Sequence, residues 1–202
     1  MSSATITVII SLITALLGPM AVEWFKTKLS NKPKDPVGEA IQLNEKIDIQ
    51  LQTIIEELGC DRVWLAQFHN GGFFYPTGKS IQKFSIFYEK VADKILSIKE
   101  TFQNIPVSLF PKLLSKVYNQ GEVIIHKENN DNMDLFSLTG EYNSVSSYNI
   151  ALNSLSDKFI GILSLSYDSK QYSLTEDEWE FLRDKATTIG VILSEYLDSK
   201  KN

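Results

Sequence analysis

The densest group of chemically capable side chains lies within one short stretch, residues 69–80. It combines an imidazole, an amide, a phenol and an ammonium group with glycines that let a ligand approach the backbone closely. Loops at strand ends are common binding sites. We therefore predict that this stretch contacts a ligand through His69, Asn70, Gly71, Gly72, Tyr75 and Lys79. The alternative is a structural hairpin loop in which Asn-Gly-Gly supplies the turn and the aromatic residues cover the core.

The tripeptide Gly78-Lys79-Ser80 invites comparison with a phosphate-binding loop. That motif requires four residues between its two glycines, whereas Gly72 and Gly78 enclose five. The residues after Ser80 also alternate like a strand and do not open the helix whose N-terminus would hold phosphate. The spacing therefore excludes nucleotide hydrolysis by this loop.

Other arrangements that support catalysis or metal binding are missing from the sequence. His69 and His126 are the two histidines and lack a matched carboxylate for a zinc site. Glu128, Asp131 and Asp134 lack the alternation of a calcium loop. No Ser-His-Asp order or nucleophile elbow stands out. We predict no catalytic residue, no metal site and no cofactor, with an enzyme that uses the His69 loop as an alternative.

Composition limits the domain count and the partners. A chain of 202 residues with 43% hydrophobic content suits one core. The net charge of −5 comes from scattered acids without a basic stripe, so nucleic acid is not a predicted partner. The single cysteine, Cys60, cannot form an internal disulfide, which favours a reducing compartment. We predict that Cys60 packs in the core and is not reactive.

The N-terminal segment carries no ionisable side chain from Met1 to Val22. As a helix, the apolar residues 5–22 would extend about 27 Å, close to the thickness of the hydrocarbon core of a bilayer. We predict one transmembrane helix, with residues 1–25 as the anchor. A cleaved signal peptide lacks its basic n-region here, and a buried core helix is the third alternative.

Charged residues after this segment predict its orientation. Four lysines follow it within a few turns: Lys26, Lys28, Lys32 and Lys34. By the positive-inside rule, a single-pass protein with these lysines places its C-terminal domain in the cytoplasm. Residues 26–36 contain Pro33 and Pro36 and form a basic, fairly stiff linker between the anchor and a domain over residues 37–202.

The remaining chain alternates between helical and strand patterns. Apolar residues at helical spacing predict a helix over 37–58 that ends at Gly59. A central strand over 62–69 stops at Asn70-Gly71-Gly72, and a long connection leads to a half-exposed strand in which Phe84, Ile86 and Tyr88 alternate with polar residues. Further elements are predicted as helices over 92–98 and 109–118 and strands over 122–126, 148–153 and 159–167.

The last helix is predicted from its start signal and its apolar seam. Thr175 and Glu178 have the spacing of a capping box. The seam consists of Trp179, Leu182, Ala186, Ile189, Leu193 and Tyr196. Such a seam packs either on the sheet of its own domain or against a second copy, in a homodimer formed through the terminal helices.

This order of elements resembles a GAF-type domain, the PAS-related sensor fold, over residues 37–197. The likeness is closest at the strand 159–167, where Phe159, Gly161, Leu163, Leu165 and Tyr167 share one face, and at the capped helix that follows. The resemblance implies an α/β (α+β) domain with a central antiparallel sheet flanked by N- and C-terminal helices. It carries over no functional residue, and the cysteine that anchors bilins in photoreceptor members has no counterpart here.

A weaker resemblance is to the holin of T-even bacteriophages, which also looks like one N-terminal span followed by an α/β domain. Two functions follow from these resemblances. The first is a membrane-anchored, non-enzymatic GAF-like sensing or interaction domain on the cytoplasmic face that binds a small ligand or a protein partner. The alternative is a phage protein of lysis control or membrane interference.

Overall fold

The computed structural model describes residues 15, 17–20, 22–24, 35–74, 76–127 and 144–199. The chain divides into two compact units, residues 1–40 and 41–202, which are described separately. Most of the predicted anchor and linker, Tyr75 and the acidic loop from Glu128 to Asp134 lie outside the described residues. In the part that is described, no helix has the length and apolar character needed to cross a bilayer.

The larger unit is built on a six-stranded sheet in which every neighbouring pair is antiparallel. The strand order is β3-β2-β1-β6-β5-β4. The antiparallel sheet and the central place of the first strand are therefore confirmed. The strands are β1 (Arg62–Phe73), β2 (Ser80–Val91), β3 (Ile105–Pro106), β4 (Glu122–His126), β5 (Ser146–Asn153) and β6 (Phe159–Tyr167).

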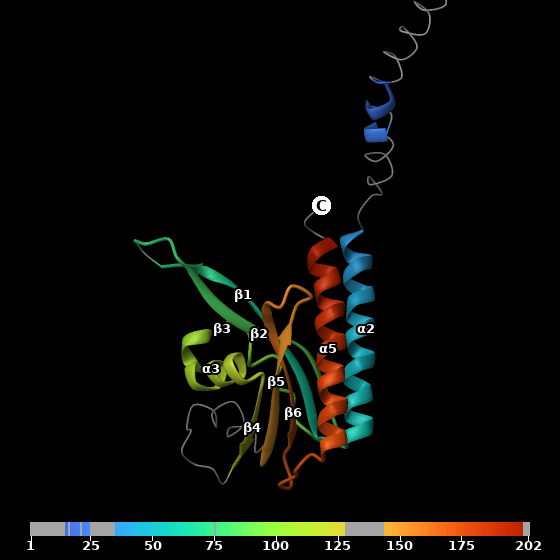
Figure 1. The fold of residues 1–202 in the computed structure, drawn as a ribbon. Helices are drawn as coiled ribbons and strands as arrows, with labels where there is room; N and C mark the ends of the chain where they lie inside the picture. The colour runs from blue at the N-terminus through green and yellow to red at the C-terminus, as the bar shows by residue number, and fades with distance from the viewer. Residues whose placement is uncertain are drawn as a thin grey trace, which may run out of the picture. The chain divides into compact units, whose positions relative to one another are not determined.

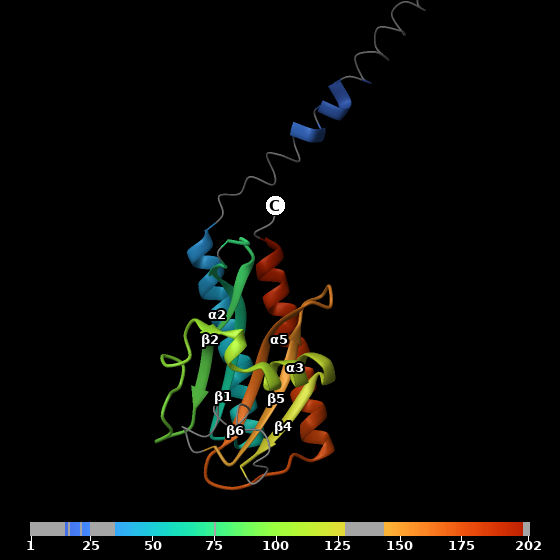
Figure 2. The ribbon, with the colours of Figure 1, turned by 90° about the vertical axis from the view of Figure 1, so that its left-hand side faces the viewer.

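Helices cover both faces of this sheet (Figure 1). Helices α2 (Pro36–Leu58) and α5 (Glu176–Ser199) lie side by side on one face. The 3-10 turn η1 (Val107–Leu109) and helix α3 (Pro111–Gln120) lie on the opposite face, as the rotated view in Figure 2 also shows. The flanking N- and C-terminal helices predicted from the sequence are confirmed.

The core beneath α2 and α5 holds the apolar seam of the last helix. Trp179, Leu182 and Leu193 are buried there with side chains of α2, β1, β5 and β6. The seam therefore packs within its own domain, the first of the two interpretations. Gly190 allows the close approach, because a Cβ at this position would lie 2.4 Å from the carbonyl oxygen of Asn153 on β5.

The core on the other face joins the sheet to α3. Its central members are Trp64 and Ala66 of β1, Phe84 of β2, and Leu113 and Val117 of α3, all of them buried. Pro111 occupies the first turn of α3, where a missing backbone N–H costs nothing. This second core fixes α3 against the middle of the sheet.

A β-bulge in β2 changes which face its side chains occupy. Leu65 pairs with Tyr88, whereas the next residue of β1, Ala66, pairs with Ile86, so Phe87 has no partner across the strand. One extra residue reverses the inside-outside alternation of a strand. The prediction that Phe84, Ile86 and Tyr88 share one face is therefore wrong for Tyr88. Tyr88 packs against the core beneath α2 and α5, whereas Phe84 and Ile86 lie in the core beneath α3.

A second bulge, at the start of β6, also reverses the face of the sheet that the side chains occupy. Leu152 pairs with Gly161 and Asn153 pairs with Phe159, which leaves Ile160 as the extra residue. The predicted shared face of this strand is therefore wrong at Phe159. Phe159 packs on the α3 side, whereas Leu163 lies in the core beneath α2 and α5.

Two other predictions about the chain path differ from the structure. Residues 92–98 form a turn and irregular chain in place of a helix. The carboxylate of Glu89 accepts the backbone N–H groups of Ile98 and Lys99, and Lys94 has a positive φ of 70°. Strand β1 also continues to Phe73, since Gly72 adopts a φ of 109° at an irregularity in the pairing. The connection between β1 and β2 is consequently shorter than predicted.

The capping box of α5 is confirmed. The backbone N–H of Thr175 donates to Glu178 Oε2 over 2.7 Å, and the N–H of Glu178 donates to Thr175 Oγ1 over 3.3 Å. The first of these hydrogen bonds, to the ionised carboxylate, lowers the pKa of Glu178. Both orphan amides at the start of the helix are thereby satisfied.

We predict that Thr175→Ala lowers the free energy of unfolding by about 1 kcal/mol, the usual cost of losing an N-cap side chain. Glu178→Gln removes the ionised partner. Because the folded-state pKa of Glu178 is lowered, its charge stabilises the protein above the ordinary glutamate pKa of about 4.3 and ceases to do so as the pH falls through the lowered value. Urea unfolding at neutral and acidic pH measures both effects.

The matched control is Glu180→Gln, an exposed position in the same helix, which should change the free energy of unfolding by less than about 0.5 kcal/mol. If the difference between wild type and Glu178→Gln stays constant down to acidic pH, the charge-dependent part of the cap does not exist.

Candidate functional site

An apolar cavity of about 480 Å³ opens between α3 and the sheet, on the side of the sheet where the core joins α3. We call it the α3 groove. Its size lies within the range of small-molecule sites. It is lined by Phe68, Gln82, Val107, Ser108, Pro111, Leu114, Ser115, Tyr118 and Phe159.

Three aromatic rings form one wall of the α3 groove. The ring of Phe159 lies with its centroid 4.8 Å from that of Phe68 and 5.8 Å from that of Tyr118, both at tilted angles. Tyr118 remains 67% exposed, which is unusual for so large a ring. Such a wall offers π faces and edges to a flat ligand.

The polar groups of the α3 groove are few and uncharged. They are Gln82, Ser108 and Ser115, and none of the described lining residues is ionisable except the Tyr118 phenol. Because the groove provides no cation for a phosphate or carboxylate, it suits a ligand whose buried part is apolar and neutral. The amide and hydroxyl groups can orient such a ligand through hydrogen bonds.

None of the described residues among the predicted binding residues lines the α3 groove, and Asn70 lies next to it. Asn70 Oδ1 accepts hydrogen bonds from Ser80 Oγ at 3.0 Å and from Gln82 Nε2 at 3.3 Å. His69, on the other face of β1, has its Nε2 2.9 Å from Ser85 Oγ. Gln82 therefore connects Asn70 to the groove, whereas His69 points away from it.

The other predicted residues form the outer part of the hairpin. Gly71 lies against the aliphatic stem of Lys83, since a Cβ at Gly71 would lie 2.4 Å from Lys83 Cδ. Gly72 and Lys79 are exposed near the tip, and Tyr75 is outside the described residues. The assignment of these side chains to a ligand stays a prediction, and the structure adds the α3 groove at the base of the same hairpin.

The His69–Ser85 contact has the length of a base–nucleophile pair. Ser85 is only 2% exposed, however, and its Oγ also accepts the backbone N–H of Asn104 over 2.8 Å. A substrate carbonyl has no access to this hydroxyl. The pair joins β1 and β2 to the segment before β3, which is a structural role.

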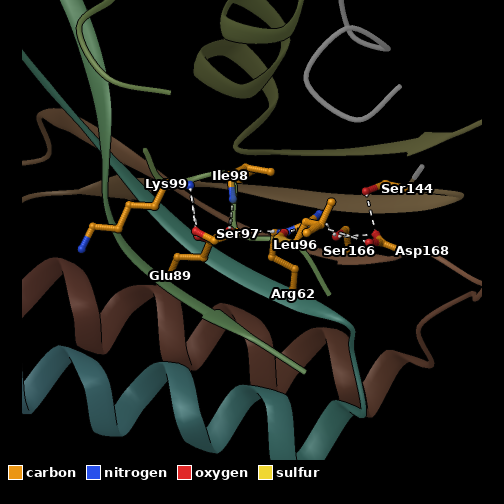
Figure 3. Close-up of polar contacts among 9 residues, drawn as sticks. All are labelled: Arg62, Glu89, Leu96, Ser97, Ile98, Lys99, Ser144, Ser166 and Asp168. Atoms are coloured by element: carbon orange, nitrogen blue, oxygen red, sulfur yellow. Dashed lines mark hydrogen bonds and ion pairs between the residues drawn. The ribbon is translucent and has the colours of Figure 1, made fainter. Parts of the chain in front are cut away.

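A buried cluster of charges holds the other end of the hairpin (Figure 3). Arg62 at the start of β1 is 2% exposed. Its guanidinium lies between two carboxylates, with Nε 3.4 Å from Glu89 Oε1 and Nη2 3.4 Å from Asp168 Oδ2. It also donates to the Leu96 carbonyl over 2.9 Å and to Ser166 Oγ over 3.3 Å. We call these residues the Arg62 cluster.

The two carboxylates of the Arg62 cluster also accept hydrogen bonds from neighbouring segments of the chain. Glu89 accepts the backbone N–H groups of Ile98 at 2.9 Å and Lys99 at 3.0 Å, together with the hydroxyl of Ser97. Asp168 Oδ1 accepts the hydroxyl of Ser144 at 2.9 Å. The cluster thus fixes the segment that leads into β3, η1 and α3, and so it positions one wall of the α3 groove.

Cys60 lies on the opposite side of the sheet from the α3 groove. It is 2% exposed and belongs to the core beneath α2 and α5. Burial raises the pKa of its thiol to about 12. The predicted packing role is confirmed, and this thiol cannot form a covalent bond to a ligand in the α3 groove.

Comparison with solved structures reveals the same architecture. The GAF domain of PixJ from Thermosynechococcus elongatus superimposes with a TM-score of 0.62 at 16% identity, covering 81% of this chain and 91% of that chain. The phycocyanobilin-bound GAF domain of a cyanobacterial phytochrome gives 0.64 at 16% identity, covering 82% and 92%. The fold is GAF-like.

A GAF domain/HD domain protein from Geobacter sulfurreducens shares this fold with a TM-score of 0.59 at 12% identity, covering 81% of this chain and 99% of that chain. At the level of sequence, no protein-family model and no curated protein matches the chain. The GAF-like fold that the resemblance implied is confirmed, since the chain superimposes on these structures over about four fifths of its length.

Two residues essential to the site escaped the sequence analysis. Phe159 and Tyr118 contribute to the wall of the α3 groove, yet the alternation of β6 placed Phe159 on the other face, and Tyr118 was predicted only as the last residue of a helix over 109–118. Arg62 was read only as the start of a strand. A charged residue before an uninterrupted apolar run is the signal that could have indicated a buried ion cluster.

We predict that Arg62→Met destabilises the protein by roughly 3–5 kcal/mol, because it leaves Glu89 and Asp168 as buried charges without their partner. Denaturant unfolding of both proteins measures the difference. Arg183→Met is the matched control, since Arg183 forms ion pairs with Glu122 and Glu176 at the surface and its loss should cost far less. Equal losses for the two variants would contradict a special role for the Arg62 cluster.

We also predict that the Cys60 thiol does not react with Ellman's reagent in the folded protein at neutral pH. The thiolate is the reactive form, and both burial and the raised pKa suppress it. One thiol per chain should react once guanidinium unfolds the protein. Rapid reaction of the folded chain would show that Cys60 is accessible and that its side of the core is open.

Proposed function

We propose that this protein is a membrane-tethered sensing module whose GAF-like domain binds a small, flat and largely apolar ligand in the α3 groove. The observation that carries the proposal is the groove itself, a cavity of about 480 Å³ with three aromatic rings on one wall and no cation among its described lining residues. Cavities of this size and character are typical of ligand sites.

The structural neighbours support a small-molecule ligand. One is described as phycocyanobilin-bound and another as phycoerythrobilin-bound, so similar folds hold conjugated chromophores. In this chain the position of Cys60, across the sheet from the α3 groove, favours non-covalent binding. The proposal therefore concerns a planar conjugated ligand held by stacking and by hydrogen bonds to neutral side chains.

Tethering to a membrane with the domain in the cytoplasm is the second part of the proposal. It is supported by the apolar residues 5–22 and by the lysines that follow them. The domain would sense its ligand at the bilayer, with α2 as the element that leads toward the anchor. Pairing of two copies through exposed parts of the terminal helices, such as Ile41 and Ile49 of α2, belongs to the same proposal.

The alternative functions receive less support. The GAF-like neighbours give no support to the resemblance to a phage holin. An enzyme that uses His69 to activate Ser85 as a nucleophile receives no support, because Ser85 is buried against Asn104.

Ser115→Trp tests the α3 groove directly, because it places an indole within the lined space while the exposed helix surface tolerates it. We expect the apparent Kd for Nile red, an uncharged planar dye, to rise at least about tenfold relative to wild type, which corresponds to about 1.4 kcal/mol. Fluorescence titration of the full chain measures it, with wild type and variant in identical buffer and with the signal of a protein-free blank subtracted.

Gln120→Trp is the matched control, since it introduces the same ring at an exposed position of α3 that does not line the groove. Its titration should follow wild type. If Ser115→Trp and wild type bind the dye equally while both melt at the same temperature, the α3 groove is not a ligand site.

A further inference from the structure

We infer that the tip of the β1–β2 hairpin, through its described residues Phe73, Phe74 and 76–79, is a second membrane contact that enters the headgroup layer of an anionic bilayer. The inference rests on the proposed tethering and goes beyond it, because it gives the folded domain its own surface for lipid. It depends on three observations on the hairpin: its projection, its exposed rings and its charge.

The hairpin extends beyond the sheet (Figure 1). Pairing between β1 and β2 continues to Phe73 and Ser80. The other neighbour of β1, strand β6, pairs with it only as far as Gln67 and Gly161. The outer residues of β1 therefore have β2 as their single strand partner, and the tip extends away from both cores.

Two adjacent phenylalanine rings occupy this tip without cover from the described part of the domain. Phe73 is 72% exposed and Phe74 is 56% exposed. The turn that carries them is closed by backbone hydrogen bonds of 2.8 Å, from the Phe74 N–H to the Lys79 carbonyl and from the Gly78 N–H to the Phe74 carbonyl. The rings thus lie beside these two hydrogen bonds, and their exposure favours a partner surface that buries them.

Charge on the hairpin identifies the kind of surface. The protein has 25 Asp and Glu in 202 residues, about one in eight, yet residues 62–88 contain none. Lys79 is exposed at the tip, and the stem of Lys83 lies along Gly71 toward it. Aromatic rings flanked by lysines and free of carboxylates match the interface of an anionic bilayer, where rings enter the headgroup level and ammonium groups meet phosphates.

The place of the tip in the domain agrees with this partner. Both views show the tip at the end of the domain where the first turns of α2 in this unit lie, near residues 41–47 (Figures 1 and 2). The chain from the predicted anchor must enter α2 at that end. A linker of residues 26–36 reaches at most roughly 40 Å when extended, so the bilayer that holds the anchor stays within reach of the domain.

The test uses the full chain reconstituted in vesicles of phosphatidylcholine and phosphatidylserine, with the fluorophore NBD on a cysteine introduced by Thr77→Cys at the tip. Buried Cys60 does not compete for the label. Ser169→Cys, at an exposed position in the connection that follows β6, is the matched label control. We expect the tip label to shift to shorter wavelength and brighten with vesicles, while the control label does not.

Substitutions then separate the contributions of rings and charge. Phe73→Ser with Phe74→Ser should abolish the shift, whereas Leu155→Ser, an equally exposed apolar residue on the β5–β6 turn, should leave it unchanged. Lys79→Gln should lower the ratio of inserted to free tip about fivefold, the effect of one lysine at an anionic surface. All these positions are exposed, so unchanged melting temperatures are expected.

Each other outcome overturns the inference in a distinguishable way. If the chain floats with the vesicles but the tip label does not respond, the tip contact is absent and the tethering stands. If the chain does not float with the vesicles, both the tethering and the tip contact fail. If the label shifts without lipid and in proportion to protein concentration, the tip binds another copy of the chain and the lipid assignment is wrong.

Discussion

The structure depends most on the buried guanidinium of Arg62. A charged group in a protein interior is stable only when its partners surround it, because desolvation costs several kcal/mol. Here Glu89 and Asp168 supply opposite charges, and a serine and a backbone carbonyl supply further acceptors. The cluster can form only when β1, β2 and β6 and the segment around Leu96 are all in place. It therefore makes the correct pairing of these strands a condition for stability.

The same cluster also connects the two cores. Arg62 lies in the strand that contributes Leu65 to the core beneath α2 and α5 and Trp64 to the core beneath α3. Through Glu89 it holds the backbone at Ile98, whose side chain is buried in the α3 core. The position of the groove walls therefore depends on the Arg62 cluster, whose residues do not line the groove, as well as on the lining side chains themselves.

Much of the fold could be predicted from periodicity and boundary signals. Glycine at 59 and the capping box at 175–178 define helix ends through local chemistry, and β4 and β6 have the predicted bounds. The faces of β2 and β6 could not be predicted, because a bulge depends on pairing between strands that are distant in sequence. The α3 groove was missed for the same reason, since Phe159 reaches it only through the bulge at Ile160. The false helix at 92–98 arose because the local pattern does not reveal the long-range capture of those amides by Glu89.

Strand β1 is a single element of twelve residues that is paired on both sides at its fixed end and on one side only at its outer end. Its first residue is held in the Arg62 cluster, its seventh, Phe68, lines the α3 groove, and its last, Phe73, reaches the exposed tip. At about 3.3 Å per residue, Phe68 lies about 20 Å from the fixed end and Phe73 about 36 Å. Pairing with β6 ends at Gln67, so Phe68 is the first residue of β1 that β2 alone holds as a strand partner. The α3 groove therefore begins where the sheet narrows from three strands to two, and a ligand in the groove would contact the strand at the point where its support changes.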